Sequence, residues 1–153
     1  MSKRISSGSR IIPVDYRVIQ RVPGQWELEI LWRFENQSRL PRYVLLDQEL
    51  TITIADPLIL NHAPSEPPFP VGVNIKADFE IIIVPPGATR ERWLQYHLAL
   101  PEAFKQTTVI GRFGHSYAPP DSAWVKSQNR REIAKWQQIA DSEVLLVRFG
   151  KQS

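Results

Sequence analysis

The strongest constraint on the fold is an alternation of large apolar and charged side chains between Gln25 and Glu35. Successive side chains of a strand point to opposite faces, so alternation with a period of two residues is typical of a strand with one buried face. A helix would distribute the same side chains around its circumference. The segment is therefore predicted to be a strand whose buried face carries Trp26, Leu28, Ile30, Trp32 and Phe34.

The same period recurs along most of the chain. Val14 to Val18 alternates before the pair Pro23-Gly24, which predicts a tight turn and a hairpin over residues 12–35. The other predicted strands are 42–55 (one strand or a bent pair), 58–60, 73–84, 90–100, 107–117 and 143–149. In 73–84 the apolar series that ends with Phe79, Ile81 and Ile83 is expected to share one face, opposite Glu80.

Turn and loop signals separate these strands, and the proline-rich stretch 62–72 predicts an extended connection. If consecutive strands alternate in direction, the connections gather in two groups at opposite ends of the domain. We expect 36–41, 62–72 and 101–106 at one end, and 22–25, 85–89 and the excursion 118–142 at the other.

One segment, 127–140, has helical instead of strand periodicity. Asn129 can cap a helix whose third residue is Glu132, which approximates a capping box. Ile133, Trp136 and Ala140 then recur at intervals of three and four residues and form one narrow apolar stripe. We expect this stripe, with Trp136, to dock the helix on a sheet.

Seven to eight strands and a single helix predict an all-β, mainly antiparallel fold, because parallel sheets need repeated crossover helices. The strand rhythm resembles the immunoglobulin and fibronectin type III class of β-sandwich, with one short C-terminal helix inserted before the last strand. This is a likeness of architecture, since the Cys-Trp-Cys pattern of immunoglobulin domains is absent. We expect a flexible N-terminal tail over 1–10 and a single domain over 11–150.

Composition narrows the possible functions. The chain has no cysteine, which excludes disulfides, thiolate nucleophiles and cysteine-ligated metals. The formal charge is only +3, and arginines such as Arg39/Arg42, Arg90/Arg92 and Arg130/Arg131 come in pairs that we assign to solvated faces, so nucleic-acid binding is not expected. No apolar run could span a membrane, and the predicted location is the cytoplasm unless a signal peptide has been removed.

Candidate chemistry is scarce. His62, His97 and His115 lack the spacing of metal ligands, and His115 and Ser116 would point to opposite faces of one strand. Acids such as Glu27 and Glu80 are predicted to be solvent-facing members of cross-strand ion pairs. We therefore predict no metal, no cofactor and no enzymatic activity; an enzyme with a His and carboxylate site assembled in space ranks third among the hypotheses.

The tryptophans provide the candidate contacts. Trp26 and Trp32 are predicted to be core. Trp93 shares a strand face with His97, and Trp124 stands in an irregular segment, so either could be exposed. The leading hypothesis is a protein-binding module whose partner contacts are Trp124, Lys126, Arg130 and Arg131. The alternative is a carbohydrate-binding module in which Trp93, Trp124 or Tyr117 stacks on sugar rings. The candidate ligand contacts are Trp93, His97 and Tyr117. We also expect self-association through edge strands, for which 143–149 is a candidate.

Overall fold

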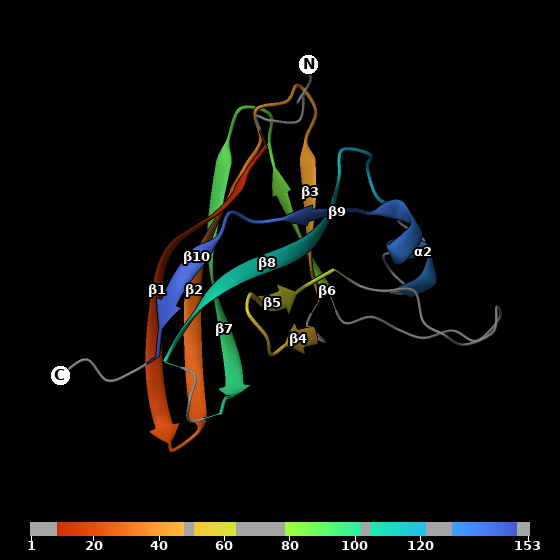
Figure 1. Cartoon of the computed structure of the whole chain (residues 1–153). Coiled ribbons are helices and arrows are strands. Elements are labelled where there is room, and N and C mark those ends of the chain that lie inside the picture. Colours follow the sequence, from red (N-terminus) through yellow and green to blue (C-terminus); the bar gives the residue numbers. More distant parts are fainter. Residues whose placement is uncertain (1–8, 48–50, 64–78, 102–104, 122–129, 150–153) are drawn as a thin grey trace.

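The computed structural model describes residues 9–47, 51–63, 79–101, 105–121 and 130–149. Within these ranges the protein is mostly β, its strands pair mainly antiparallel, and two sheets enclose a common core (Figure 1). One short helix completes the described part of the chain. No helix in these ranges is long and apolar enough to cross a membrane.

Sheet A consists of three antiparallel strands in the order β1 (Ile11–Val22), β2 (Gln25–Glu35) and β7 (Thr89–Ala99). The predicted hairpin is confirmed: Gly24 adopts a φ of 82° in the turn between β1 and β2, a conformation that favours glycine. The predicted face of β2 is also confirmed, because Leu28, Ile30 and Trp32 are fully buried.

Sheet B is built around the long strand β8 (Gln106–Ser116). Along one edge β8 pairs with β10 (Leu145–Arg148) and then β9 (Gln138–Asp141). Along the other edge it pairs in parallel with β5 (Leu58–Asn61) and antiparallel with β3 (Arg42–Asp47). β4 (Thr51–Thr53) extends the sheet beyond β5, and β6 (Phe79–Val84) extends it beyond β3.

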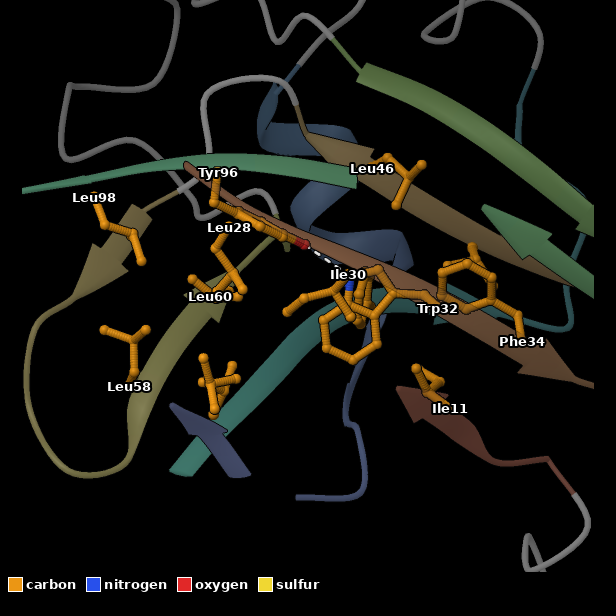
Figure 2. Packing of buried hydrophobic residues seen from close by; sticks show 14 of the residues in the cluster. Ile11, Leu28, Ile30, Trp32, Phe34, Leu46, Leu58, Leu60, Tyr96 and Leu98 are labelled. Atoms are coloured by element: carbon orange, nitrogen blue, oxygen red, sulfur yellow. Dashed lines mark hydrogen bonds between the residues drawn. The ribbon is translucent and has the colours of Figure 1, made fainter. Parts of the chain in front are cut away.

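The core lies between the two sheets, as Figure 2 shows for residues from β1, β2, β3, β5 and β7. Trp32 packs edge-to-face on Phe113, with ring centroids 5.3 Å apart. Gly111 faces the same tryptophan, and a Cβ at this position would lie 2.6 Å from its Cη2 atom. Glycine is therefore required in β8, because only a residue without a side chain lets the indole reach the sheet.

The helix α2 (Arg130–Trp136) packs on the face of sheet B that is turned away from sheet A (Figure 1). Ile133 contacts Leu45 of β3, and the indole N–H of Trp136 donates to the carbonyl of Ala118 at 3.0 Å. The prediction that Trp136 docks the helix on a sheet is confirmed. The helix nevertheless ends earlier than expected, at Trp136, because Gln138–Asp141 forms β9 and Ala140 packs against the main core.

The predicted grouping of the loops is wrong. Asn36 donates its backbone N–H to the carbonyl of Ala88, so the connections 36–41 and 85–89 lie at the same end of the sandwich. Leu100 donates to Gly24 at the opposite end. The cause is that the consecutive strands β5 and β6 run in the same direction. β5 is parallel to β8, and β6 has the direction of β8 as well, because β3 is antiparallel to both β6 and β8.

The predicted face of β6 is also wrong. Ile82 and Val84 contact the main core, whereas Ile81 packs with the cluster beneath α2 and Ile83 is 55% exposed. The run of four apolar residues in this strand has no alternation, so the sequence does not specify which face is inside. Val73 to Asp78, the first half of the predicted strand, lies outside the described residues.

The described chain begins at Ser9, inside the segment predicted as a flexible tail. Arg10 already belongs to the sandwich: its carbonyl accepts the N–H of Glu35, and its guanidinium lies 3.0 Å from Glu143 and 3.6 Å from Glu35.

Candidate binding surface

The free side of β7 is the longest regular strand edge in the described part of the chain. All eleven residues of β7 pair with β2 in one unbroken register, from Gln25 opposite Ala99 to Glu35 opposite Thr89. The N–H of Leu100 and the carbonyl of Ala88 point toward the β1–β2 hairpin, so even-numbered residues of β7 face β2. The odd-numbered residues therefore direct their backbone N–H and C=O groups away from β2, and we call this side the β7 edge: Thr89, Glu91, Trp93, Gln95, His97 and Ala99.

The side chains of these residues lie on the outer face of sheet A, as the sequence predicted for Trp93 and His97. Trp93 is 39% exposed, and the guanidinium carbon of Arg17 lies 4.3 Å from its ring centroid. Arg17 also forms an ion pair with Glu29 at 3.0 Å. Trp93 thus presents an apolar surface that is held in place from one side by a cation–π contact.

Ion pairs also lie on this outer face. Arg21 binds Glu27 through two hydrogen bonds of 2.9 Å, and Gln95 donates to the same carboxylate at 3.1 Å. The hydrogen bond from Arg21 lowers the pKa of Glu27. The prediction that Glu27 belongs to a cross-strand ion pair is confirmed.

Glu80 is the other acid predicted to belong to a cross-strand ion pair, but its ion pair joins strands of different sheets. It binds Arg92 through two hydrogen bonds of 2.9 and 2.7 Å. The two residues belong to β6 and β7, and therefore to different sheets. The ion pair connects the two sheets beside the β7 edge, and the hydrogen bonds lower the pKa of Glu80 while they raise that of Arg92.

The structure does not bring the three predicted ligand contacts together. Trp93 and His97 lie on the outer face of sheet A, with Gln95 between them. Tyr117 follows the end of β8 in sheet B, where its ring lies 5.8 Å from that of His115. Trp124 and Lys126 lie outside the described residues, as do the side chains of Arg130 and Arg131, whose backbones begin α2. The partner contact predicted there stays a prediction.

A second polar cluster, centred on Arg42, occupies the end of the core near the start of β1. Arg42 is 1% exposed, which contradicts its assignment to a solvated face. Its Nε donates to Nδ1 of His115 at 3.2 Å, and its Nη1 donates to the carbonyls of Glu35 at 2.9 Å and Arg10 at 3.5 Å. Burial lowers the pKa of Arg42. Burial and, secondarily, the positive charge of Arg42 lower the pKa of His115 to about 4.

This cluster borders an open pocket of about 230 Å³ between the start of β1 and the bend that joins β9 to β10. Its charged lining is balanced: Arg10 and Arg42 face Asp141 and Glu143, and both acids form ion pairs with arginines. Sequence reasoning missed Arg42. The signal was its position two residues before Val44 and four before Leu46, which places it on the buried face of β3.

A third polar cluster lies within the core and is structural. The indole N–H of Trp32 donates to the hydroxyl of Tyr96 at 2.8 Å, the bond drawn in Figure 2. The same hydroxyl lies 2.7 Å from Nε2 of His62. We infer that the hydroxyl donates to this nitrogen, because its oxygen already accepts the hydrogen bond from the indole. Burial raises the pKa of Tyr96 far above its ordinary value. The cluster joins β7, β2 and the end of β5 across the core.

The three histidines do not form a common site, since His62 is in the core, His97 is on the outer face of sheet A and His115 contacts Arg42. In the described ranges, no group of three or more His, Cys, Asp or Glu residues is placed to hold a metal ion. No protein-family model, curated protein or solved structure matches this chain. The geometry of the described residues is therefore the basis for a functional proposal.

Proposed function

We propose that this chain is a non-enzymatic β-sandwich module that binds another protein by adding an extended segment of its partner to the β7 edge. One observation carries the proposal: eleven residues pair with β2 without a bulge, while the opposite side of the strand has no partner among the described residues. Unpaired backbone groups in a long regular edge are a template for strand addition. In this mode main-chain hydrogen bonds supply affinity and alternate side chains supply specificity.

We also infer that the sandwich has the immunoglobulin or fibronectin type III arrangement. β1, β2 and β7 match the first, second and fifth strands of an immunoglobulin domain, which lie in one sheet in that order. β3, β8 and β10 match the third, sixth and seventh, and β6 matches the strand that variable-type domains add beside the third. In this comparison β4, β5 and β9 have no counterpart. The arrangement supports a binding role only through the surface it presents, because fold alone does not determine function.

The outer face beside the β7 edge suggests the chemistry of the partner. A strand added there would place alternate side chains next to Trp93, Gln95 and His97. Trp93 favours an apolar or aromatic neighbour, and the other two favour polar ones. We therefore expect the partner segment to be extended, to lack proline at positions that donate hydrogen bonds, and to carry an apolar side chain opposite or diagonal to Trp93.

The carbohydrate-binding alternative has less support. Trp93 is exposed enough to stack on a sugar ring, but Arg17 already lies over its ring. Tyr117, a second aromatic residue of that hypothesis, follows the end of β8 in the other sheet, and the third, Trp124, lies outside the described residues. A flat surface with several aromatic rings, which sugar stacking favours, is not formed by these residues.

The test uses two glutamines on opposite edges of sheet A. The N–H of Gln95 points away from β2, and alternation along β1 places the N–H of Gln20 on the opposite free edge. Proline removes this N–H and is tolerated at strand edges. Gln95→Pro should therefore abolish strand addition at β7, while Gln20→Pro serves as the control for a proline at the other edge of the same sheet.

Binding is read out by a photo-reactive amino acid placed at His97 or, as a control, at Ile19. These residues lie in one row across sheet A, because each is paired with Glu27. Irradiation in the native cell should give a discrete protein adduct from position 97 and none from position 19. The adduct should disappear with Gln95→Pro and persist with Gln20→Pro. Absence of an adduct at position 97, or an adduct that Gln95→Pro leaves unchanged in a folded protein, would overturn the proposal.

A further inference from the structure

We infer that the segment added to the β7 edge is β7 of a second copy of this chain, so that two copies form a continuous six-stranded sheet. The inference rests on the proposed function, since it names the partner of the same edge. It depends on the sequence of β7, which is complementary to itself when two copies run antiparallel about a two-fold axis at Leu94.

The backbone is the first element of this complementarity. With the axis at Leu94, the whole strand Thr89–Ala99 overlaps its copy without overhang. The opposed residues Thr89 with Ala99, Glu91 with His97, and Trp93 with Gln95 all carry the outward N–H and C=O groups of the β7 edge. Each is then a hydrogen-bonded pair and each occurs twice, which gives about twelve hydrogen bonds.

The side chains are the second element. Glu91 stands opposite His97, an acid opposite a hydrogen-bond donor, and this pair occurs on both sides of the axis. The two Trp93 side chains are diagonal neighbours across the axis, at a separation that aromatic side chains can bridge. No pair in this register sets like charges opposite each other. Moving the axis to Arg92 would set this arginine against its own copy and shorten the overlap, which disfavours that register.

The opposite edge explains why assembly would stop at two copies. β1 contains Pro13, and its register with β2 shifts at two places, between Pro13 and Asp15 and between Gln20 and Val22. Proline and bulges prevent edge-to-edge pairing. With one uninterrupted pairing edge on sheet A of each copy, an interface through β7 is isologous and closes as a dimer instead of extending sheet A into a filament.

The experiment measures the mass of the full-length protein by sedimentation over two orders of magnitude in concentration, beginning in the micromolar range. The mass should approach twice 17.6 kDa. Gln95→Pro should return it to that of one chain, and Gln20→Pro should not. A monomer throughout the range, or a dimer that persists in folded Gln95→Pro, would overturn the inference.

The register is tested with cysteines, which is straightforward because the chain has none. In the proposed dimer Glu91→Cys and His97→Cys face each other across the interface, within the Cα separation that a disulfide allows. Position 91 lies about 20 Å from its own copy. Mixing the two variants under mild oxidation should give a covalent dimer, and Glu91→Cys alone should not. If Glu91→Cys alone cross-links as efficiently as the mixture, the proposed register is rejected. This test does not require the Gln95→Pro variant to fold.

The failures of the two proposals can be distinguished. If the protein is a monomer in solution but position 97 still gives an adduct with another protein, the second copy is rejected as the partner. Strand addition at the β7 edge is then retained. A monomer without an adduct at position 97 removes both.

Discussion

The two edges of sheet A are of similar length, twelve residues in β1 and eleven in β7, but among the described residues only β1 has features that protect an edge. β1 carries Pro13 and two shifts of register, and the hydroxyl of Tyr16 accepts the N–H of Arg148 from β10 at 3.3 Å. β7 has no proline and pairs with β2 without interruption. These features of β1 are the ones by which proteins prevent unwanted strand pairing. An uninterrupted β7 beside an interrupted β1 is what the proposed strand addition requires.

The edges are also held in different ways. The start of β1 depends on Arg42, which donates to the carbonyl of Arg10 and in turn relies on His115 as an acceptor. The middle of β7 is held from inside the core by Tyr96 and from the side by Arg92. Conditions that weaken one set of contacts should leave the other intact, and the predictions below use this difference.

Acidification should produce the largest effect, and it should loosen β1 before β7. The pKa of His115 is about 4 in the folded protein, compared with 6.5 for an unperturbed histidine. At a pH between these two pKa values, His115 binds a proton in the unfolded chain but not in the folded chain. The free energy of unfolding should therefore fall as the pH drops from about 6.5 toward 4, by up to about 3 kcal/mol.

Urea unfolding at a series of pH values measures this loss, with His115→Gln as the control. Glutamine keeps an acceptor for Arg42 but does not titrate, so the variant should lose much of the pH dependence in this window. Hydrogen exchange locates the effect: the N–H of Ile12 should lose protection before that of Leu94, although both face β2. An equal pH dependence in wild type and variant would contradict the role of His115.

Removing one hydroxyl from each edge strand should give a smaller and unequal effect. Tyr96→Phe leaves the buried indole N–H of Trp32 without its acceptor, which should cost about 2 kcal/mol. Tyr16→Phe releases the N–H of Arg148 at an exposed position, where water replaces the hydroxyl, and should cost less than about 0.5 kcal/mol. Chemical denaturation of both variants gives the comparison, and equal losses would show that the core cluster is not what holds β7.

The contrast between strands also explains what could be predicted from sequence. β2 and β7 each bury one face and expose the other, so alternation identified both strands and their inward residues. β6 lies between the core and α2, and its uninterrupted apolar run specified no face. The sequence predicts the end of a helix at β9, because Ala140 fits a helical stripe. The strand is evident only from its pairing with β8 and from the ion pair of Asp141 with Arg112.

The candidate site could be predicted only in part. The alternation of β7 placed Trp93 and His97 on one exposed face, which the structure reproduces. That β7 is an edge strand could not be predicted, because strand order depends on long-range pairing that leaves no local pattern. The buried position of Arg42 depends likewise on three acceptors far apart in sequence: Arg10, Glu35 and His115.

The smallest predicted effect concerns the ion pair that ties β7 to the other sheet. In Glu80–Arg92 the two side chains are 43% and 39% exposed, so a double-mutant cycle with Glu80→Gln and Arg92→Gln should give a coupling energy below about 1 kcal/mol that shrinks with added salt. Arg33–Glu91 is a control within sheet A, with nearly the same exposure and N···O distance but one hydrogen bond instead of two. A similar coupling in both pairs would mean that the contact between sheets has no special strength. The β7 edge would then owe its regularity to its pairing with β2, and the Glu80→Gln protein should sediment like the wild type. Loss of association in Glu80→Gln, with the melting temperature unchanged, would instead make this ion pair the element that presents the edge.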